Sequence, residues 1–233
     1  MKTSRFCIYC GRRANSRDHV PPKCLLERPF PENLSTVPAC QECNRGFALD
    51  EEYFRVVLAS TSTKPLLEVK VTEGGVVDRA FEMSQNWDAS VIHALRVDAE
   101  DRVLLATQEG RLARVIAKIA AGLYFLRYGQ IVNLHRLEPV RAFPCGPPED
   151  QRPWQLLACM VGGDFRFKRW SLVQENVFSS IVVRDSEWKM WCVMNFYDAL
   201  WGVTCFPQPK SLKPPRRVSK TNDRQLSLLE GVL

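Results

Sequence analysis

The sequence predicts an α+β protein in which a cysteine-rich N-terminal segment precedes a larger region with a buried helix and antiparallel strands. Residues 1–60 carry two matching Cys-x-x-Cys pairs, and residues 111–129 are apolar over most of a helical surface. Residues 178–206 are rich in β-branched and aromatic side chains, which favour strands. We expect two domains, 1–60 and 66–206, followed by a basic, proline-rich tail over 207–233.

The N-terminal segment is defined by Cys7, Cys10, Cys40 and Cys43. Each Cys-x-x-Cys can turn back on itself and present two thiolates to one ion, and two such pairs complete a tetrahedral structural Zn²⁺ site. The 29 residues between the pairs (11–39) exceed the usual spacing of a zinc ribbon, so a sizeable insertion separates them. A redox-active pair of thioredoxin type is the alternative, but neither pair follows an apolar strand and opens a helix.

Further along the chain the expected elements follow in order. Apolar residues recur with helical spacing from residue 41 to about residue 58, although Gly46 lies inside that stretch. A Gly-Gly turn between two β-rich runs predicts a hairpin over 66–83, and a short helix is expected to open at Asp88. The strongest helix is 111–129, which Gly129 should end, and two or three strands are expected over 178–206.

The composition narrows the class of protein. A hydrophobic content of 45% supports a folded core, and no uncharged apolar run reaches the roughly 20 residues of a membrane span. The first ten residues, "MKTSRFCIYC", lack the apolar stretch of a secretory signal, so we expect a cytoplasmic protein with no membrane partner. Nine cysteines in a reducing compartment favour metal ligation over a disulfide framework.

The charge is concentrated at the two ends of the chain. The net charge of +6, with a pI of about 8.9, permits nucleic acid as a partner. Residues 1–28 carry seven Lys and Arg against two acidic residues, and residues 207–233 carry six against two. The middle of the chain is nearly balanced.

Further elements lie between and after the cysteine pairs in a fixed order: "RDHVPP" at 17–22, Asn33-Leu34, and Asn44 directly after Cys43. Together with the cysteines they resemble the HNH nuclease family, which has a ββα-metal fold. Its members commonly show a Cys-x-x-Cys, Asp-His followed by proline, Asn-Leu, and a second Cys-x-x-Cys with His or Asn next. "NRG" at 44–46 is also similar to the helix start of the HNH domain in RNA-guided DNA nucleases. The resemblance covers about residues 5–56, under a quarter of the chain.

The resemblance implies a metal-dependent endonuclease that hydrolyses phosphodiester bonds in nucleic acid, with DNA as the expected substrate. His19 would be the general base, Asp18 and Asn44 would hold Mg²⁺ or Mn²⁺, and Asn33 would orient the histidine loop. Many members have His where this chain has Asn44, and an amide oxygen suits a hard cation such as Mg²⁺. Glu51, in the helix expected after the second cysteine pair, is a further candidate ligand of this cation.

Asp18 and His19 are neighbours in a strand-like segment, so their side chains should point to opposite sides. A bend must therefore aim both at one phosphate, or one group must lie on each side of it. Two other functions remain open: a zinc-framed nucleic-acid-binding protein without catalysis, and a zinc-framed protein-interaction module. Residues 66–206 carry no chemical motif, and their role is open. His93 and His135 have no partner pattern that would favour chemistry over packing.

Overall fold

The computed structural model describes residues 5–61, 95–97, 103–105, 109–137, 140–144, 152–161, 169–185, 187 and 189–207. The hairpin expected over 66–83, the helix expected at Asp88 and the tail from residue 208 onward lie outside these ranges. The α+β class and the antiparallel pairing of the strands are confirmed. Within the described ranges, no helix has the length and apolar character needed to cross a membrane.

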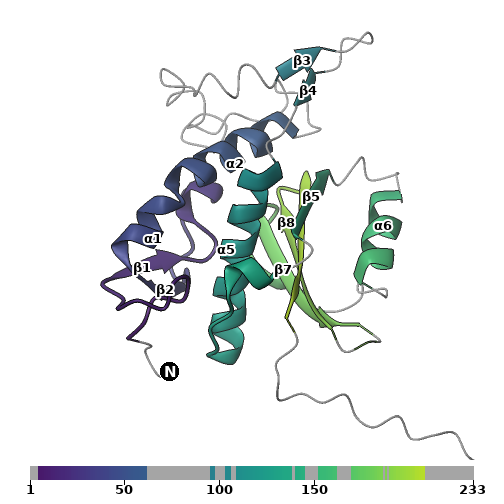
Figure 1. The fold of residues 1–233 in the computed structure, drawn as a ribbon. Coiled ribbons are helices and arrows are strands. Elements are labelled where there is room, and N and C mark those ends of the chain that lie inside the picture. Colours follow the sequence, from purple (N-terminus) through teal and green to yellow (C-terminus); the bar gives the residue numbers. More distant parts are fainter. Residues whose placement is uncertain are drawn as a thin grey trace, which may run out of the picture.

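The N-terminal part begins with an antiparallel hairpin (Figure 1). β1 (Ser16–His19) pairs with β2 (Thr36–Ala39) in a register that sets Asp18 opposite Val37. Because successive strand residues alternate between faces, Asp18 and buried Val37 point to the inner face, and His19 points to the other. The hairpin therefore separates the two adjacent residues of the Asp-His pair.

Two consecutive helices follow the hairpin. α1 (Gln41–Gly46) starts directly after β2, and α2 (Ala48–Thr61) follows it. The sequence predicted one helical stretch here, and the structure divides it at Phe47. Gly46 has a low helix propensity, and the buried Phe47 ring packs edge-on against Tyr9 at 5.3 Å between ring centroids. The break between α1 and α2 thus lets the Phe47 ring point inward and pack against Tyr9.

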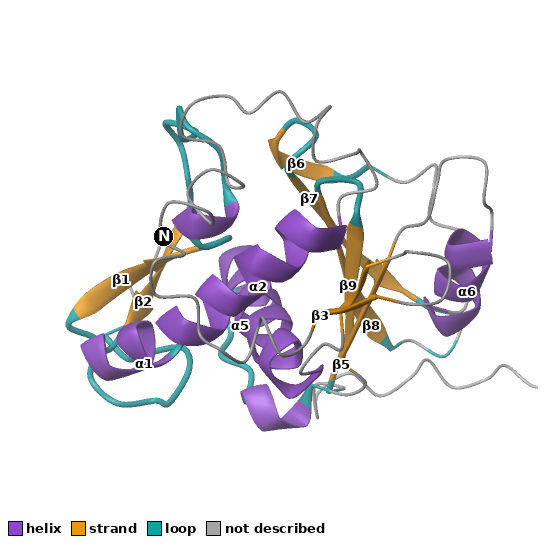
Figure 2. Cartoon of the chain, turned by 90° about the horizontal axis from the view of Figure 1, so that it is seen from above, coloured by secondary structure: helices purple, strands orange, loops and turns teal. Residues whose placement is uncertain are grey.

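The predicted central helix is confirmed as α5 (Glu109–Tyr128), and Gly129 ends it with a positive φ of 66°. The helix is buried over most of its middle turns, as its apolar sequence requires. Figures 1 and 2 show α5 between α2 on one side and the sheet on the other. α5 therefore packs against both the N-terminal helices and the sheet.

The part of the chain that follows α5 contains a five-stranded antiparallel sheet in the order β5-β9-β8-β7-β6. Where the β-branched sequence predicts two or three strands, the structure has three, and they have the longest pairing: β7 (Phe178–Arg184), β8 (Met190–Phe196) and β9 (Leu200–Phe206). Two strands that the sequence did not indicate form the edges: β5 (Val140–Pro144) and β6 (Ser171–Gln174).

The sheet is covered on both faces, and β8 shows why its sequence lacks simple polar alternation. Cys192 and Met194 face α5, whereas Trp191 and Val193 face α6 (Arg152–Val161) on the opposite side. Figure 2 shows α6 on the far side of the sheet from α5. A strand buried on both faces reads as a continuous apolar run.

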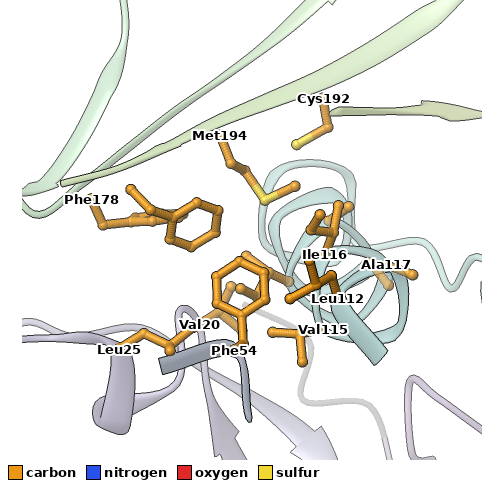
Figure 3. Close-up of a cluster of buried hydrophobic side chains, with 14 of the residues drawn as sticks. Val20, Leu25, Phe54, Leu112, Val115, Ile116, Ala117, Phe178, Cys192 and Met194 are labelled. Carbon is orange, nitrogen blue, oxygen red and sulfur yellow. The ribbon is translucent and has the colours of Figure 1, made fainter. Parts of the chain in front are cut away.

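One core crosses the boundary that the sequence suggested between 1–60 and 66–206. Val20 and Phe54 from the N-terminal part belong to the same buried cluster as Ile116 of α5 and Met194 of the sheet (Figure 3). The Phe54 and Phe196 ring centroids are 4.9 Å apart. The N-terminal part therefore depends on α5 and the sheet for the burial of its apolar side chains.

Four short elements complete the described ranges: η1 (Lys23–Leu25), β3 (Leu95–Val97), β4 (Val103–Leu105) and η3 (Leu134–Arg136). β3 and β4 pair with each other as an antiparallel ribbon.

Candidate functional site

The four cysteines predicted to bind zinc come together. Cys7 and Cys10 lie in a tight turn, closed by the Gly11 amide donating to the Cys7 carbonyl at 2.9 Å. Cys40 and Cys43 lie at the start of α1, where the Cys43 amide donates to Cys40 Sγ at 3.4 Å. All four sulfurs are within 4.8 Å of one another, and a tetrahedral site with Zn–S bonds of roughly 2.3 Å needs S···S separations of about 3.8 Å. This cluster could hold a metal ion.

The chemistry of these thiols also suits a cation. Burial raises the pKa of Cys7 and of Cys43, because thiolates without a nearby positive charge are costly in an apolar environment. The Arg12 guanidinium donates to Cys10 Sγ at 3.4 Å and lowers the pKa of Cys10 to about 6. The described cysteines are free thiols, and four sulfurs in one cluster favour metal binding over a single redox pair.

His19 ends β1 with its side chain half-buried. Burial lowers its pKa, the positive charge of Lys23 lowers it further, and Asp18 opposes both effects. The imidazole is therefore neutral at neutral pH and can accept a proton. No hydrogen bond to the His19 side chain is found among the described residues, so its ring nitrogens are available to an external water.

Asp18 is buried, with 5% of its surface exposed, and it points away from His19 toward α5. Its Oδ2 accepts a hydrogen bond from the Tyr9 hydroxyl at 2.9 Å and lies 2.8 Å from Lys118 Nζ. Burial and the Asp18 charge raise the pKa of Tyr9, so the phenol remains a donor. Asp18 Oδ1 has no hydrogen-bond partner within the described part of the chain.

Glu51 lies beside Asp18, as the sequence allowed. Its Oε1 contacts the same Lys118 ammonium, and the Cys24 thiol points at its Oε2 from 3.8 Å. Burial raises the pKa of Glu51, and Lys118 opposes this shift. Burial also raises the pKa of Cys24 to about 12, which keeps that thiol protonated. Asp18, Glu51 and Lys118 thus form a buried charged cluster between β1, α2 and α5.

Asn44 attaches α1 to the strand that carries Asp18. Its Nδ2 donates to Ser16 Oγ at 3.0 Å and to the Arg17 carbonyl at 3.2 Å. Ser16 and Asp18 are two residues apart in β1, so they point to the same face. Asn44 and Asp18 therefore lie on one face of the hairpin, and Asn44 Oδ1, like Asp18 Oδ1, has no partner among the described residues.

Among the described residues, no hydrogen bond joins Asn33 to the other predicted site residues. Asn33 is exposed in the turn before β2, and its side chain makes no hydrogen bond within the described ranges. The loop after His19 is held by backbone instead, since the Val20 amide donates to the Ser35 carbonyl at 3.0 Å. The orienting role of Asn33 stays a prediction.

The loop between β1 and β2 (residues 20–35), which follows His19, is also held by the five-stranded sheet. Gln174 of β6 donates to the Glu27 carbonyl and accepts from the Glu27 amide, both at 3.0 Å. The Tyr197 hydroxyl donates to the Leu25 carbonyl at 3.3 Å. These contacts fix the segment after His19 through its main chain.

A basic and aromatic group lies in the same loop. Lys23 Nζ and Arg28 Cζ lie 5.4 Å and 5.6 Å from the centroid of the Phe30 ring. Both cations are exposed, and Lys23 is near enough to lower the pKa of His19. Such a group can bind the phosphates of a nucleic acid.

Sequence reasoning missed Tyr9 and Lys118. Tyr9 gave no signal, because one tyrosine between two cysteines fits any zinc turn. Lys118 gave a weak signal, since it is the one charge within "VIAKIAAG", an otherwise apolar stretch. A lysine there is either at the surface or paired in the interior.

Comparisons with models of protein families, with curated proteins and with solved structures found no match for this chain. A function for this chain is therefore inferred from the geometry of its own residues.

Proposed function

We propose that the chain is a divalent-metal-dependent endonuclease of HNH type, which hydrolyses phosphodiester bonds in DNA and is stabilised by a structural zinc ion. The observation that carries the proposal is the arrangement of Asp18 and Asn44. Each is held through one atom, on the same face of the hairpin beside the four cysteines, and each leaves its Oδ1 without a partner among the described residues.

The residues fit the two cations. Four thiolates are a closed structural zinc set, with no position left for substrate. The carboxylate oxygen of Asp18 and the amide oxygen of Asn44 are hard ligands of the kind that Mg²⁺ and Mn²⁺ prefer. A divalent cation bound there would supply charge neutralisation at the phosphate and the leaving oxygen.

His19 has the properties of the general base. Its neutral imidazole accepts a proton from the water whose oxygen attacks phosphorus, and the P–O bond to the leaving oxygen then breaks. Because His19 and Asp18 face opposite sides of β1, the phosphate is expected at the end of the strand, with one group on each side. Lys23 and Arg28 would bind neighbouring phosphates of the same strand.

The Asp18–Lys118 contact favours a second candidate, a zinc-framed DNA-binding protein without catalysis. The ammonium already compensates the carboxylate that would bind the divalent cation. This candidate predicts DNA binding without metal-dependent cleavage.

The deciding experiment compares the parent with His19→Ala on supercoiled plasmid, with Mg²⁺, with Mn²⁺ and with a chelator of divalent cations. We expect cleavage by the parent in Mg²⁺ or Mn²⁺, and a loss of about 10²- to 10⁴-fold in His19→Ala, which is the usual contribution of a general base. Zinc content by elemental analysis, DNA affinity and the melting temperature should stay at the parent's values.

His135→Ala is the matched control, because His135 is an exposed histidine in η3. It should cleave as the parent does. Equal nicking by the parent and His19→Ala would assign the activity to another group or to a contaminant. DNA binding with no cleavage by the parent would establish the second candidate.

A further inference from the structure

Lys118 is buried, and burying a lysine ammonium costs free energy of folding unless the charge is paired. It is 1% exposed and lies in the middle of α5, next to the buried residues Ala117 and Ile119. An ammonium group in such surroundings must be paired to offset the loss of its hydration. Its Nζ contacts carboxylates from two other elements, Asp18 of β1 and Glu51 of α2, and lies 5.2 Å from the centroid of the Phe47 ring.

The charges of this cluster do not balance. With both carboxylates ionised, Asp18 and Glu51 carry two negative charges against the one positive charge of Lys118. A divalent cation at Asp18 would leave the cluster with one positive charge, which the single negative charge of a phosphodiester would neutralise. The cluster is therefore complementary to a divalent cation together with a phosphodiester, and a simple ion pair would need only one carboxylate.

The two oxygens of Asp18 have different surroundings. Oδ2 faces two donors, the Tyr9 hydroxyl and the Lys118 ammonium, and both are on the interior side of β1. A carboxylate with both donors on one oxygen is fixed in rotation, so the other oxygen has a defined direction. Without those donors, the neighbouring Glu51 carboxylate would repel Asp18 and change its orientation.

We propose that Lys118 is a positioning residue of the cleavage site: together with Tyr9 it holds Asp18 Oδ2, so that Oδ1 is directed at the divalent cation. The proposal rests on the nuclease function proposed above. It gives the region after residue 66 a role in that function, because α5 then supplies part of the support for the site.

The test uses the full chain and a charge-balanced pair of substitutions, Lys118→Met with Glu51→Gln. Removing Lys118 alone would leave two unpaired buried carboxylates and risk unfolding. The double variant removes one positive and one negative charge, so the net field at the cation changes little. Glu51→Gln alone is measured beside it, and the difference between the two variants isolates the loss of orientation from any direct part of Glu51 in binding the cation. Tyr9→Phe is a second variant, which removes the other donor with no change in charge.

The matched control is Arg111→Met with Asp50→Asn. Arg111 Nε lies 2.9 Å from Asp50 Oδ1, so this pair also joins α5 to α2, but neither residue contacts Asp18 in the described structure. Asp50 also pairs with Arg114 of α5 at 2.7 Å, so the control reports what the loss of ion pairs between these two helices does to stability alone. Melting temperatures are measured for every variant.

Two quantities are compared: Mn²⁺ affinity, from the paramagnetic resonance signal of free Mn²⁺, and the rate of plasmid cleavage. Losing a group that orients a metal ligand usually costs about 10- to 100-fold in affinity or activity. We expect a loss in this range for the Lys118/Glu51 double variant and a smaller loss for Tyr9→Phe. The Arg111/Asp50 control should keep parental values for both.

The proposal is overturned if the Lys118/Glu51 variant binds Mn²⁺ and cleaves as the parent does, whatever its melting temperature. If that variant does not fold, unchanged Mn²⁺ affinity in Tyr9→Phe overturns it. A third outcome is a parent that binds Mn²⁺ at Asp18, as shown by loss of binding in Asp18→Asn, and yet does not cleave DNA. In that outcome the nuclease function fails, and the Mn²⁺ affinities of the variants still decide the role of Lys118. A parent with no Asp18-dependent Mn²⁺ binding overturns the Lys118 proposal.

Discussion

At the scale of single residues, Asn44 has two separable roles in this structure. Its Nδ2 joins α1 to β1 through Ser16 and Arg17, and its Oδ1 is the atom proposed to bind the divalent cation. His19, in contrast, makes no hydrogen bond among the described residues and is proposed to act on water. Substitutions at these two positions should therefore respond differently to the cation.

We predict that Asn44→Ala lowers both stability and cleavage, and that Mn²⁺ partly restores only cleavage. The two lost hydrogen bonds should cost about 1 kcal/mol each, measured as a change in the free energy of unfolding. Raising Mn²⁺ should compensate for the missing ligand by mass action. Titration of cleavage against Mn²⁺ checks this, and His19→Ala is the control that Mn²⁺ should not restore. Equal restoration of both variants would contradict the separate roles.

At the scale of elements, the close approach of α5 to the segment after His19 is set by a glycine. A Cβ added at Gly122 would lie 2.5 Å and 3.0 Å from the two methyl carbons of Val20. Val20 is buried, and a β-branched side chain has few alternative rotamers. The absence of a side chain at Gly122 therefore lets α5 pack directly against the residue that follows His19.

We predict that Gly122→Ala destabilises the protein even though alanine favours helix. The gain in helix propensity is about 1 kcal/mol, whereas overpacking a filled core costs about 1–3 kcal/mol. Displacement of Val20 should also move His19, so cleavage should fall at temperatures where the variant is fully folded.

Gly110→Ala is the control, because Gly110 is in the same helix and its added Cβ meets no atom within 4 Å. Thermal unfolding and cleavage of the two variants are compared. A Gly122→Ala variant as stable and active as Gly110→Ala would show that this contact does not constrain the site.

The sequence predicted those elements and ligands whose signals are local. The cysteine pairs, α5 with its end at Gly129, and the strands β7 to β9 follow from spacing, periodicity and composition. Edge strand β6 escaped detection, since its four residues, only partly buried, carry little signal. The contacts of Lys118 with Asp18 and Glu51 could not be predicted, because they depend on how α5 packs and not on any local pattern.

At the scale of the whole molecule, the N-terminal part and the sheet share one core. Val20, Leu25 and Phe54 pack with α5 and the sheet and not only among themselves. Three of the cysteines, Cys7, Cys40 and Cys43, form a separate, smaller apolar cluster with Ala39 and Tyr9. Zinc can therefore organise the cysteine turns, but it cannot bury the rest of the N-terminal segment.

We predict that a fragment of residues 1–61 binds about one zinc ion but does not unfold cooperatively. Its apolar side chains would be exposed to water without α5 and the sheet, and a small segment has too little core of its own. Elemental analysis, calorimetry and near-ultraviolet circular dichroism check this. Deletion of residues 208–233, which leaves every described element in place, is the control and should keep the cooperative transition. A cooperative transition in the fragment, comparable to that of the full chain, would contradict a shared core.

The long sequence separation within the charged cluster has a consequence for biosynthesis. Lys118 follows Glu51 by 67 positions, so the ribosome completes β1 and α2 well before it makes α5. If Lys118 positions Asp18, nascent chains and products of premature termination before α5 hold the cysteines and His19 but lack the group that orients Asp18. The proposed DNA hydrolysis would then be about 10- to 100-fold weaker in such chains, and the order of translation itself would limit cleavage by incomplete chains.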